Sequence, residues 1–453
     1  MKIKTTKKEL TAQDIATICL RMDEGSRHIR RLKRYYKGDM DIMRKRAREN
    51  STINNKVVAN FCKYISNMST GFFIGKPVTY SSITKNDEEV TALNEVFRYN
   101  DEEYHNLMLA EAASITGAGY EVLYMDEDAN IRFECLPPDE VVLVCDASLE
   151  ENILYAIRKY RVYDIAGSTY QDYVYVYDAD SVTSYRYTEG QLQLIAGPDA
   201  HFFDGVPVVE YPNNKECEGD FEGILSMNDA YNKAQSLTMD DMEDFTDAFL
   251  LLKGMGGCTA DDVRQLRKSK VIPLDEGGGA EWLIKNLNDT YIENIKSRLQ
   301  RDIHKFSSVP DMSDESFAGN ASGVAIKYKL IGLELIRSRK ERGFKKGLQR
   351  RIELIAGMLK MKNVADVDFR DISITFTANI PADVKSQADM VKELYGLVSQ
   401  KTLLSLLPFI TDPKAEMDEL KQEEDERIGG GLDGGNERSV LGPSDDGAGA
   451  GVE

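Results

Sequence analysis

The spacing of apolar residues changes along the chain, and each change predicts a different kind of structure. Residues 54–70 have apolar positions at three- and four-residue steps, which predicts a helix with one buried face. These positions are Val57, Phe61, Tyr64, Ile65 and Met68. From 121 the period becomes two, and EVLYMDEDANIRFECLPPDE predicts a hairpin that turns at Asp126 to Asn130. Alternating, tyrosine-rich segments continue to 216, so this half is predicted to be a β domain with helical flanks.

From Phe221 the pattern is helical again and predicts one long amphipathic helix that ends near residue 253. Its apolar stripe consists of Ile224, Met227, Tyr231, Ala234, Met242, Phe245, Phe249 and Leu252. The other face is predicted to carry four acidic residues, Asp240, Glu243, Asp244 and Asp247. Like charges one turn apart destabilise a helix slightly. Two interpretations stay open for this acidic stripe: a plain solvated face, or an acidic surface with a function.

A glycine- and serine-rich loop separates two further helical segments. Residues 254–288 predict a short β-rich insert, and 290–309 a helix that Pro310 ends. The loop follows, and from about 324 to 360 a helix of ~55 Å is predicted at 1.5 Å per residue, basic in its second half. Long loops inside compact domains are uncommon and usually functional. This loop is therefore a candidate functional segment, and a plain surface loop is the alternative.

The C-terminal part is predicted to be a strand, a helical region and a tail. Residues 369–383 alternate like a strand, and 385–410 are helical in pattern. From about Glu423 the composition is acidic and glycine-rich, which predicts disorder.

Composition narrows the class of protein. The chain has 453 residues, 42% hydrophobic and 29% charged, with a formal net charge of −19. These proportions fit a soluble globular protein, and the acidity argues against extensive phosphate binding. No apolar run approaches the ~20 residues of a membrane helix, and the N-terminus lacks the apolar segment of a signal peptide. Six cysteines form no C-x-x-C pair, which favours a reduced, cytoplasmic setting.

Motifs for catalysis, metal binding and nucleotide binding are absent from the sequence. There is no G-x-x-x-x-G-K-[ST], G-x-S-x-G or H-E-x-x-H, and the four histidines lack metal-ligand spacing. DEDAN at 126–130 resembles the start of a calcium loop, but Ile131 replaces the glycine and Pro137 the bidentate glutamate. We therefore predict no catalytic residues, no metal site, no cofactor and no enzymatic activity.

Four long segments resemble the portal proteins of tailed bacteriophages, of the siphophage type found in phages of Gram-positive hosts. They are YYKG (35–38), NNKVVANFCKYISNMSTGFFIGKPVTY (54–80), NDAYNKAQS with DFTDAFLLLKG (228–254), and the segment from SSVPDMSDESFAGNASGV to KKGLQRR (307–351). The resemblance covers roughly residues 30 to 400 and implies an α+β portal fold, with wing, stem, clip and crown, long helices and a small β-rich clip.

The resemblance also implies boundaries for these parts. They are an N-terminal segment (1–25), the wing (26–222 with 362–385), the stem helices (223–253 and 289–310), the clip (254–288), the tunnel loop (311–323), the long helix (324–361), the crown (386–422) and the disordered acidic tail (423–453).

A portal protein forms a ring of about twelve subunits at one capsid vertex. The resemblance implies that double-stranded DNA passes non-specifically through this ring during packaging and ejection. The implied partners are the terminase large subunit, then head-completion or adaptor proteins, and the major capsid and scaffolding proteins, with no membrane. The implied locations are the virion and, during assembly, the host cytoplasm.

Three groups of site residues follow from the resemblance. The tunnel loop places Asp311, Met312, Ser313, Asp314, Glu315, Phe317, Gly319, Asn320 and Gly323 at the DNA channel. The acidic stripe, Asp240, Glu243, Asp244 and Asp247, is predicted to line the channel, where it repels phosphates. The clip residues predicted to face terminase or connector proteins are Lys268, Lys270, Asp275, Glu276 and Trp282.

Two other functions stay open from the sequence. One is another head–tail connector or capsid structural protein. The other is a nucleic-acid-processing ATPase or nuclease, which needs a phosphate loop or clustered carboxylates at a metal site. The basic second half of the long helix is predicted to face other protein or acidic helices of neighbouring copies rather than DNA.

Overall fold

The computed structural model describes two compact units, residues 1–379 and 380–453, each taken by itself below. The described residues are 1–47, 53–165, 167–246, 249–253, 259, 261, 264, 279–283, 289–313, 323–379, 384–407, 410 and 413–429. Side chains are not described for 244–253, 279–283, 289, 323–324 and 384–388, nor for a few further positions near the C-terminus.

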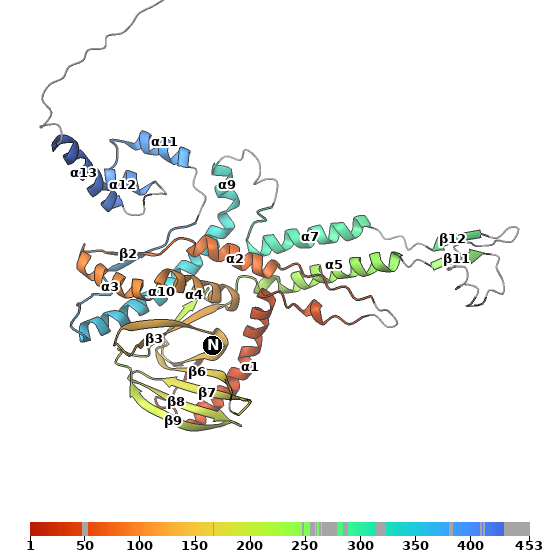
Figure 1. The fold of residues 1–453 in the computed structure, drawn as a ribbon, viewed down its shortest axis with the longest axis horizontal. Helices are drawn as coiled ribbons and strands as arrows, with labels where there is room; N and C mark the ends of the chain where they lie inside the picture. The colour runs from red at the N-terminus through yellow and green to blue at the C-terminus, as the bar shows by residue number, and fades with distance from the viewer. Residues whose placement is uncertain are drawn as a thin grey trace, which may run out of the picture. The chain divides into compact units, whose positions relative to one another are not determined.

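A six-stranded sheet forms one layer of the first unit (Figure 1). Its order is β1 (Lys2–Thr5), β5 (Val141–Asp146), β6 (Ile153–Asp164), β7 (Thr169–Tyr177), β8 (Ser181–Thr188) and β9 (Gln191–Ala200), with only β1–β5 parallel. Helix α1 (Ala12–Tyr36) begins at a capping box on Thr11 and Asp14. Its residues Ile15, Ile18 and Met22 pack against valines of this sheet.

A second, three-stranded sheet lies at the centre of the larger core. It consists of β10 (Val208–Pro212), β3 (Ala118–Met125) and β4 (Ile131–Leu136), and η2 (Pro138–Glu140) follows β4. The predicted hairpin is confirmed, because β3 and β4 pair antiparallel and the Asp126 N–H donates to the Asn130 carbonyl at 3.1 Å. Helices α3 (Asp87–Tyr99) and α4 (Glu102–Thr116) pack around this sheet, and β2 (Thr79–Ser82) pairs with β13 (Ile372–Thr375).

The helix predicted from residue 54 begins only at Phe61, which starts α2 (Phe61–Ile74). Residues 53–60 have no regular secondary structure, so placing Val57 on the helix was wrong. Asn60 explains the start, since its side chain accepts a hydrogen bond from the Lys63 N–H at 2.9 Å and caps the helix. The short helix η1 (Asp41–Arg44) lies between α1 and this segment.

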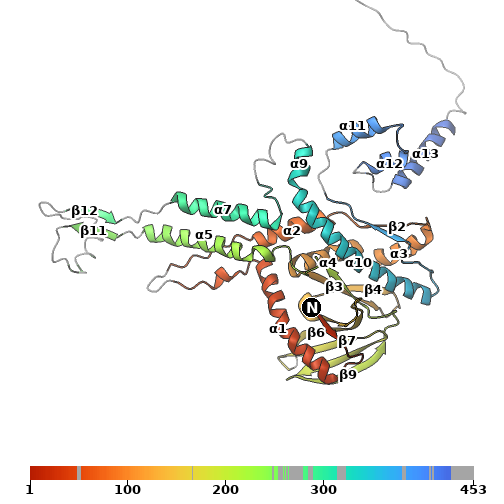
Figure 2. The same ribbon diagram turned by 180° about the vertical axis from the view of Figure 1, so that it is seen from behind.

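Helices α5 (Leu225–Thr246) and α7 (Asp289–Ser307) run side by side, and β11 (Phe249–Lys253) and β12 (Gly279–Leu283) lie beyond them (Figures 1 and 2). The turn η3 (Glu222–Ile224) precedes α5. The predicted helix to 253 is therefore too long. Phe249 and Leu252 belong to a strand, because β11 finds a partner in β12, with Leu250 opposite Trp282.

The predicted helix at 324–360 is divided at Leu330 into α9 (Gly323–Lys329) and α10 (Ile331–Met361). A Cβ added at Gly332 would lie 2.4 Å from the Ser308 carbonyl oxygen, so the first turn of α10 touches the end of α7. α10 continues unbroken through Gly343 and Gly347, and the missing side chains at these positions allow close packing against Pro212 and Tyr211.

The second unit contains α11 (Val384–Leu394), α12 (Gln400–Ser405) and α13 (Pro413–Gly429). α13 continues past Glu423, where the sequence predicted the start of disorder, and the tail from 430 lies outside the described residues. Within the part of the chain that the structure describes, no helix combines the length and the apolar character needed to cross a membrane.

Candidate functional site

The candidate site is the base of the 311–323 loop, where the end of α7 meets α2. The Tyr64 hydroxyl, on α2, donates to the Pro310 carbonyl at 2.9 Å and accepts from the Met312 N–H at 3.0 Å. The ring of Tyr64 also packs edge-on against His304, with 5.6 Å between ring centroids. One tyrosine thus holds the first residues of the loop against the folded unit.

Asp311 adds a second anchor. Its carboxylate accepts from the Gln300 side chain at 2.9 Å and from the Ser313 N–H at 3.0 Å, and it lies 3.6 Å from His304 Nε2. Burial by itself raises the pKa of Asp311, but the bonds from Ser313 and Gln300 and the charge of His304 outweigh it and lower the pKa. The carboxylate is therefore charged at neutral pH and tied to α7.

The chain after the loop returns to the end of α7. Gly323 begins α9, and the contact of Gly332 with Ser308 brings the start of α10 against the end of α7. Val309 and Leu333 are both buried, at 0% and 1% exposure. Ser308 and Gly332, on either side of the loop and α9, are therefore in contact.

The structure describes only part of the predicted tunnel loop. Asp311 is partly buried, whereas Met312 and Ser313 are exposed, and Gly323 starts a helix. The other predicted loop residues lie outside the described residues: Asp314, Glu315, Phe317, Gly319 and Asn320. Their role at a channel stays a prediction.

A row of polar side chains on α5 bonds to the backbone of residues 55–61. Asn228, Asn232 and Ser236 are fully buried, and Asp240 is 2% exposed. They accept from every second backbone N–H, at 3.3 Å from Phe61, 2.7 Å from Ala59, 2.9 Å from Val57 and 2.7 Å from Asn55. We call these four residues the polar ladder. Through them α5 stabilises an extended segment that has no strand partner in the described structure.

The polar ladder corrects the interpretation of the acidic stripe. Asp240 is not on a solvated face, because it pairs with Lys45 and accepts from Asn55. Burial raises the pKa of Asp240, but Lys45 and Asn55 outweigh it and lower the pKa. Glu243 is exposed, the side chain of Asp244 is not described, and Asp247 lies outside the described residues. Of the four residues of the acidic stripe, Glu243 is therefore the one whose described position, on the surface, is compatible with lining a channel.

The spacing of the polar ladder was a signal that sequence reasoning missed. Its members stand four residues apart on one helix face, where polar residues were taken to face solvent. Conversely, large apolar side chains on α5 and α7 are exposed: Met239 42%, Met242 58%, Tyr291 63%, Ile295 37% and Phe306 63%. This helix pair therefore exposes several large apolar side chains in the described protomer.

Some of the basic side chains in the second half of α10 are buried, although the sequence predicted that they lie on the surface. Arg351 is fully buried and contacts Glu121 with Nη2–Oε2 at 2.7 Å, and its Nη1 donates to Asn106 at 2.8 Å. Lys340 is 3% exposed and bonds to Asp220 at 2.6 Å. The prediction that this half faces other proteins is therefore wrong for Arg351 and Lys340, whose charges compensate buried carboxylates.

The predicted clip residues are largely untested. Lys268, Lys270, Asp275 and Glu276 lie outside the described residues. Trp282 lies in β12, opposite Leu250 of β11. Their contact with terminase or connector proteins stays a prediction.

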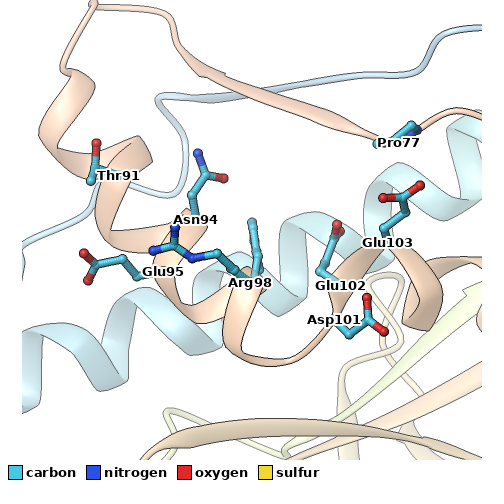
Figure 3. Close-up of a pocket in the computed structure, with 9 residues that line it drawn as sticks. Pro77, Thr91, Asn94, Glu95, Arg98, Asp101, Glu102 and Glu103 are labelled. Carbon is cyan, nitrogen blue, oxygen red and sulfur yellow. The ribbon is translucent and has the colours of Figure 1, made fainter. Parts of the chain in front are cut away.

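An open pocket of about 540 Å³ lies where α3 meets α4. Figure 3 shows Asn94, Glu95 and Arg98 on α3, and Asp101, Glu102 and Glu103 at the start of α4. None of its lining residues is a cysteine, serine, lysine or histidine. Among the residues that the structure describes, no group of three or more histidine, cysteine or acidic side chains is placed to hold a metal ion.

Comparison with known proteins identifies the class to which this fold belongs. Residues 21–430 match the family model described as phage portal protein, SPP1 Gp6-like, so the chain belongs to this family of portal proteins. The family is structural, and phage portal proteins are part of the virion capsid.

Two relatives carry the same name. The chain is 25% identical over 423 residues to the portal protein of Bacillus phage SPP1, covering 86% of this chain and 82% of the relative. It is 24% identical over 422 residues to the portal protein of Clostridium phage phiCD119, covering 86% and 91%. A solved structure titled "Neck of empty GTA particle computed with C6 symmetry" is similar with a TM-score of 0.42 and 11% identity, covering 77% of this chain and 90% of that chain.

Proposed function

We propose that copies of this chain form a ring at one capsid vertex and that the 311–323 loop of each copy lines the narrowest part of its bore. The observation that carries this proposal is the anchoring of the loop. Tyr64 and Asp311 hold its start, and the chain that follows it through α9 returns to Ser308 in the first turn of α10. In this proposal the anchored start keeps the loop at the bore while it contacts the moving duplex.

Exposed apolar residues on α5 and α7 support the ring. Met242, Tyr291 and Phe306 are each more than half exposed, and burying such side chains stabilises association by roughly 25 cal/mol per Å² of apolar area. In a closed ring every copy offers this surface to a neighbour, and no copy is left with an open face except in an incomplete ring.

Double-stranded DNA passes through the proposed bore non-specifically during packaging and ejection. A protein with a net charge of −19 does not bind phosphates extensively, which is the property that a conduit needs. Glu243 contributes to this acidic surface, and Asp244 follows it on α5. Asp247 lies outside the described residues, and its place in the channel wall stays a prediction. The chain itself has no enzymatic role in this proposal, and a separate motor supplies the energy.

The β11–β12 pair at the far end of α5 and α7 offers the contact for the terminase large subunit and later for head-completion or adaptor proteins. The two antiparallel strands lie beyond the ends of a helix pair and form a protruding element. Such an element is accessible to one partner after another. The major capsid and scaffolding proteins are the proposed partners of the rest of the ring, and assembly takes place in the host cytoplasm.

Substitution of two loop glycines tests this function. Gly319→Ala combined with Gly323→Ala restricts the backbone at both positions, and we expect DNA packaged into proheads to fall while rings form normally. Gly223→Ala is the matched control, since a Cβ there meets no atom within 4 Å. The readouts are DNase-protected DNA and electron micrographs of the purified rings. Normal packaging by the double variant would count against a channel role for the loop.

A further inference from the structure

His304 lies in the last turn of α7 and faces two oxygen atoms of the chain that follows the helix. Its Nδ1 is 3.0 Å from the carbonyl oxygen of Val309, and its Nε2 is 3.6 Å from Oδ2 of Asp311. The side chain of His304 is 12% exposed and that of Asp311 26%, so the contact is shielded from most of the solvent. Each nitrogen of the ring thus has an oxygen of its own.

The two oxygens determine how the imidazole uses its protons. A backbone carbonyl only accepts hydrogen bonds, so Nδ1 carries a proton and donates to Val309. In the neutral ring Nε2 then has only a lone pair, and the carboxylate of Asp311 is an acceptor as well. In the imidazolium both nitrogens donate. The hydrogen bond between His304 and Asp311 therefore forms only when the ring is charged.

Asp311 stays charged while an imidazole changes its charge. Burial raises the pKa of Asp311, but the bonds from Ser313 and Gln300 and the charge of His304 outweigh it and keep the pKa below its ordinary value of 3.8. Imidazole side chains in general lose their proton around pH ~6.5. A change from about pH 5.5 to about pH 8 therefore acts on the ring and leaves the carboxylate ionised.

The carboxylate of Asp311 joins α7 to the start of the 311–323 loop. Its Oδ1 accepts from the N–H of Ser313 at 3.0 Å and from the hydroxyl of Ser313 at 2.6 Å. Its Oδ2 accepts from the Gln300 side chain at 2.9 Å and is the atom that faces His304. A charged His304 adds a second bond on the α7 side, and this bond is stronger than the one from Gln300 because its donor is charged. Residues 311–313 are then held more firmly.

The surroundings of His304 favour Asp311 as the partner of the charged ring. From α2 the titratable neighbour is Tyr64, whose ring packs edge-on and whose hydroxyl is bonded to Pro310 and Met312. Other charged side chains of α7 and of the elements packed against it have contacts elsewhere or face solvent: Lys305 of α7 lies over Phe306, Lys63 of α2 over Tyr36, Glu222 of η3 pairs with His28, Asp229 of α5 accepts from Tyr35, Glu334 of α10 pairs with Arg337, and Arg301 of α7 and Lys233 of α5 are exposed. The C-terminal end of a helix also favours a cation.

We propose that His304 is a positioning residue that anchors the start of the 311–323 loop in a proton-dependent way. The charged ring bonds Asp311 and holds residues 311–313 against α7, whereas the neutral ring leaves this bond unmade. The stabilisation is present at low pH and is lost as the pH rises through the range in which imidazoles lose their proton. The inference rests on the proposed function for the place of the loop at the bore, but the anchor itself lies within one copy of the chain.

Amide hydrogen exchange in the full-length chain tests this inference. Exchange at Met312 and Ser313 is measured at about pH 5.5 and about pH 8 by mass spectrometry with fragmentation to single residues. Each rate is divided by the intrinsic exchange rate at that pH, which gives the protection of the amide. We expect protection to be about five- to tenfold higher at the lower pH, as one additional charge-assisted bond implies. Mass photometry at both pH values shows whether rings form.

Two variants remove the proton dependence and keep the remaining bonds. His304→Asn retains an N–H donor for the Val309 carbonyl but has no group that titrates. Asp311→Asn retains an acceptor for Ser313 and removes the charge. We expect protection in both variants to be equal at the two pH values, within about twofold. His28→Asn is the matched control, because His28 pairs with the carboxylate of Glu222 away from the loop, and it is expected to keep the pH dependence of the unaltered chain.

Protection that does not depend on pH in the unaltered chain overturns the inference. So does pH dependence that survives in His304→Asn or Asp311→Asn, or that is lost in His28→Asn. If circular dichroism shows that one of the first two variants is misfolded, the other decides. Rings with pH-independent protection overturn the inference and leave the proposed function intact. Proton-dependent protection without rings supports the inference and contradicts the proposed function.

Discussion

The side-chain oxygen of Asn232 lies 2.7 Å from the backbone nitrogen of Ala59, and Asn232 itself is completely buried. The bond joins α5 to a segment 173 residues earlier in the chain. Three equivalent bonds flank it, from Asn228, Ser236 and Asp240. The polar ladder thus does for residues 55–61 what a neighbouring strand does in a sheet, because it accepts from every second backbone N–H.

Removing one rung of the polar ladder leaves a backbone donor unsatisfied. Asn232→Leu keeps most of the volume but takes away the acceptor of Ala59, and we expect the free energy of unfolding to fall by about 1–3 kcal/mol. Urea denaturation followed by circular dichroism measures the change. Lys233→Leu is the control, since Lys233 is exposed on the same helix and is expected to change stability by less than about 0.5 kcal/mol. Equal effects of the two substitutions would contradict the account.

The Arg351–Glu121 pair predicts a dependence of stability on pH. Burial alone raises the pKa of Glu121, but Arg351 and His105 outweigh it and lower the pKa to about 2, from an ordinary value of 4.5. A carboxyl whose pKa is lower in the folded protein stabilises the fold above its ordinary pKa. That stabilisation is lost as the pH falls from about 4.5 towards 2.

The comparison that isolates this group is wild type against Glu121→Gln. We expect the wild type to be more stable at pH 7, by about 3 kcal/mol, and the difference to shrink steadily below pH 4.5. Denaturation at a series of pH values down to 3 measures it. A difference that stays constant over this range would show that the carboxyl has an ordinary pKa.

Tyr64 predicts the local stability of the loop base. Tyr64→Phe removes the acceptor of the Met312 N–H and the donor to the Pro310 carbonyl. We expect the Met312 amide to exchange with deuterium about five to ten times faster, as the loss of about 1 kcal/mol implies. Tyr104→Phe is the control, because Tyr104 is 58% exposed on α4. Unchanged exchange at Met312 would mean that the loop is held elsewhere.

Two glycines on α10 predict stability changes of opposite sign. A Cβ at Gly347 would lie 2.4 Å from the ring of Tyr211, which is fully buried, so Gly347→Ala is expected to destabilise the protein by at least about 1–3 kcal/mol. At Gly357 the nearest atom would be 3.7 Å away, and Gly357→Ala is expected to stabilise it by about 0.5–1 kcal/mol. Thermal unfolding compares the two, and the same sign for both would be inconsistent with this packing.

Local signals predicted the elements whose partners are close in sequence. The β3–β4 hairpin followed from alternation on either side of Asp126 to Asn130, because the turn and both strands lie in one short segment. The positions of α2 and α7 followed from helical periodicity, although α2 begins later than predicted. The family resemblance rested on long segments and is confirmed by the match over residues 21–430.

The missed features depend on residues that are distant in sequence. Because Asp240 is charged, the sequence suggested that it faces solvent. In the structure it is buried against Lys45 and Asn55, which lie almost 200 residues earlier in the chain. Arg351 stands in a dense basic run, yet its partner Glu121 lies 230 residues away on β3. Phe249 continued a helical stripe, and only the pairing of β11 with β12 makes it a strand residue. The sequence pattern around each of these residues does not include its partner, so it could not predict the contact.

The most direct test of the central claim is electron cryo-microscopy of the purified full-length chain. The account predicts a closed ring of about twelve 50.9 kDa protomers with a central hole, and density for residues 311–323 at its narrowest point. A population that stays monomeric under assembly conditions, or a ring with 311–323 on its outer surface, would contradict it.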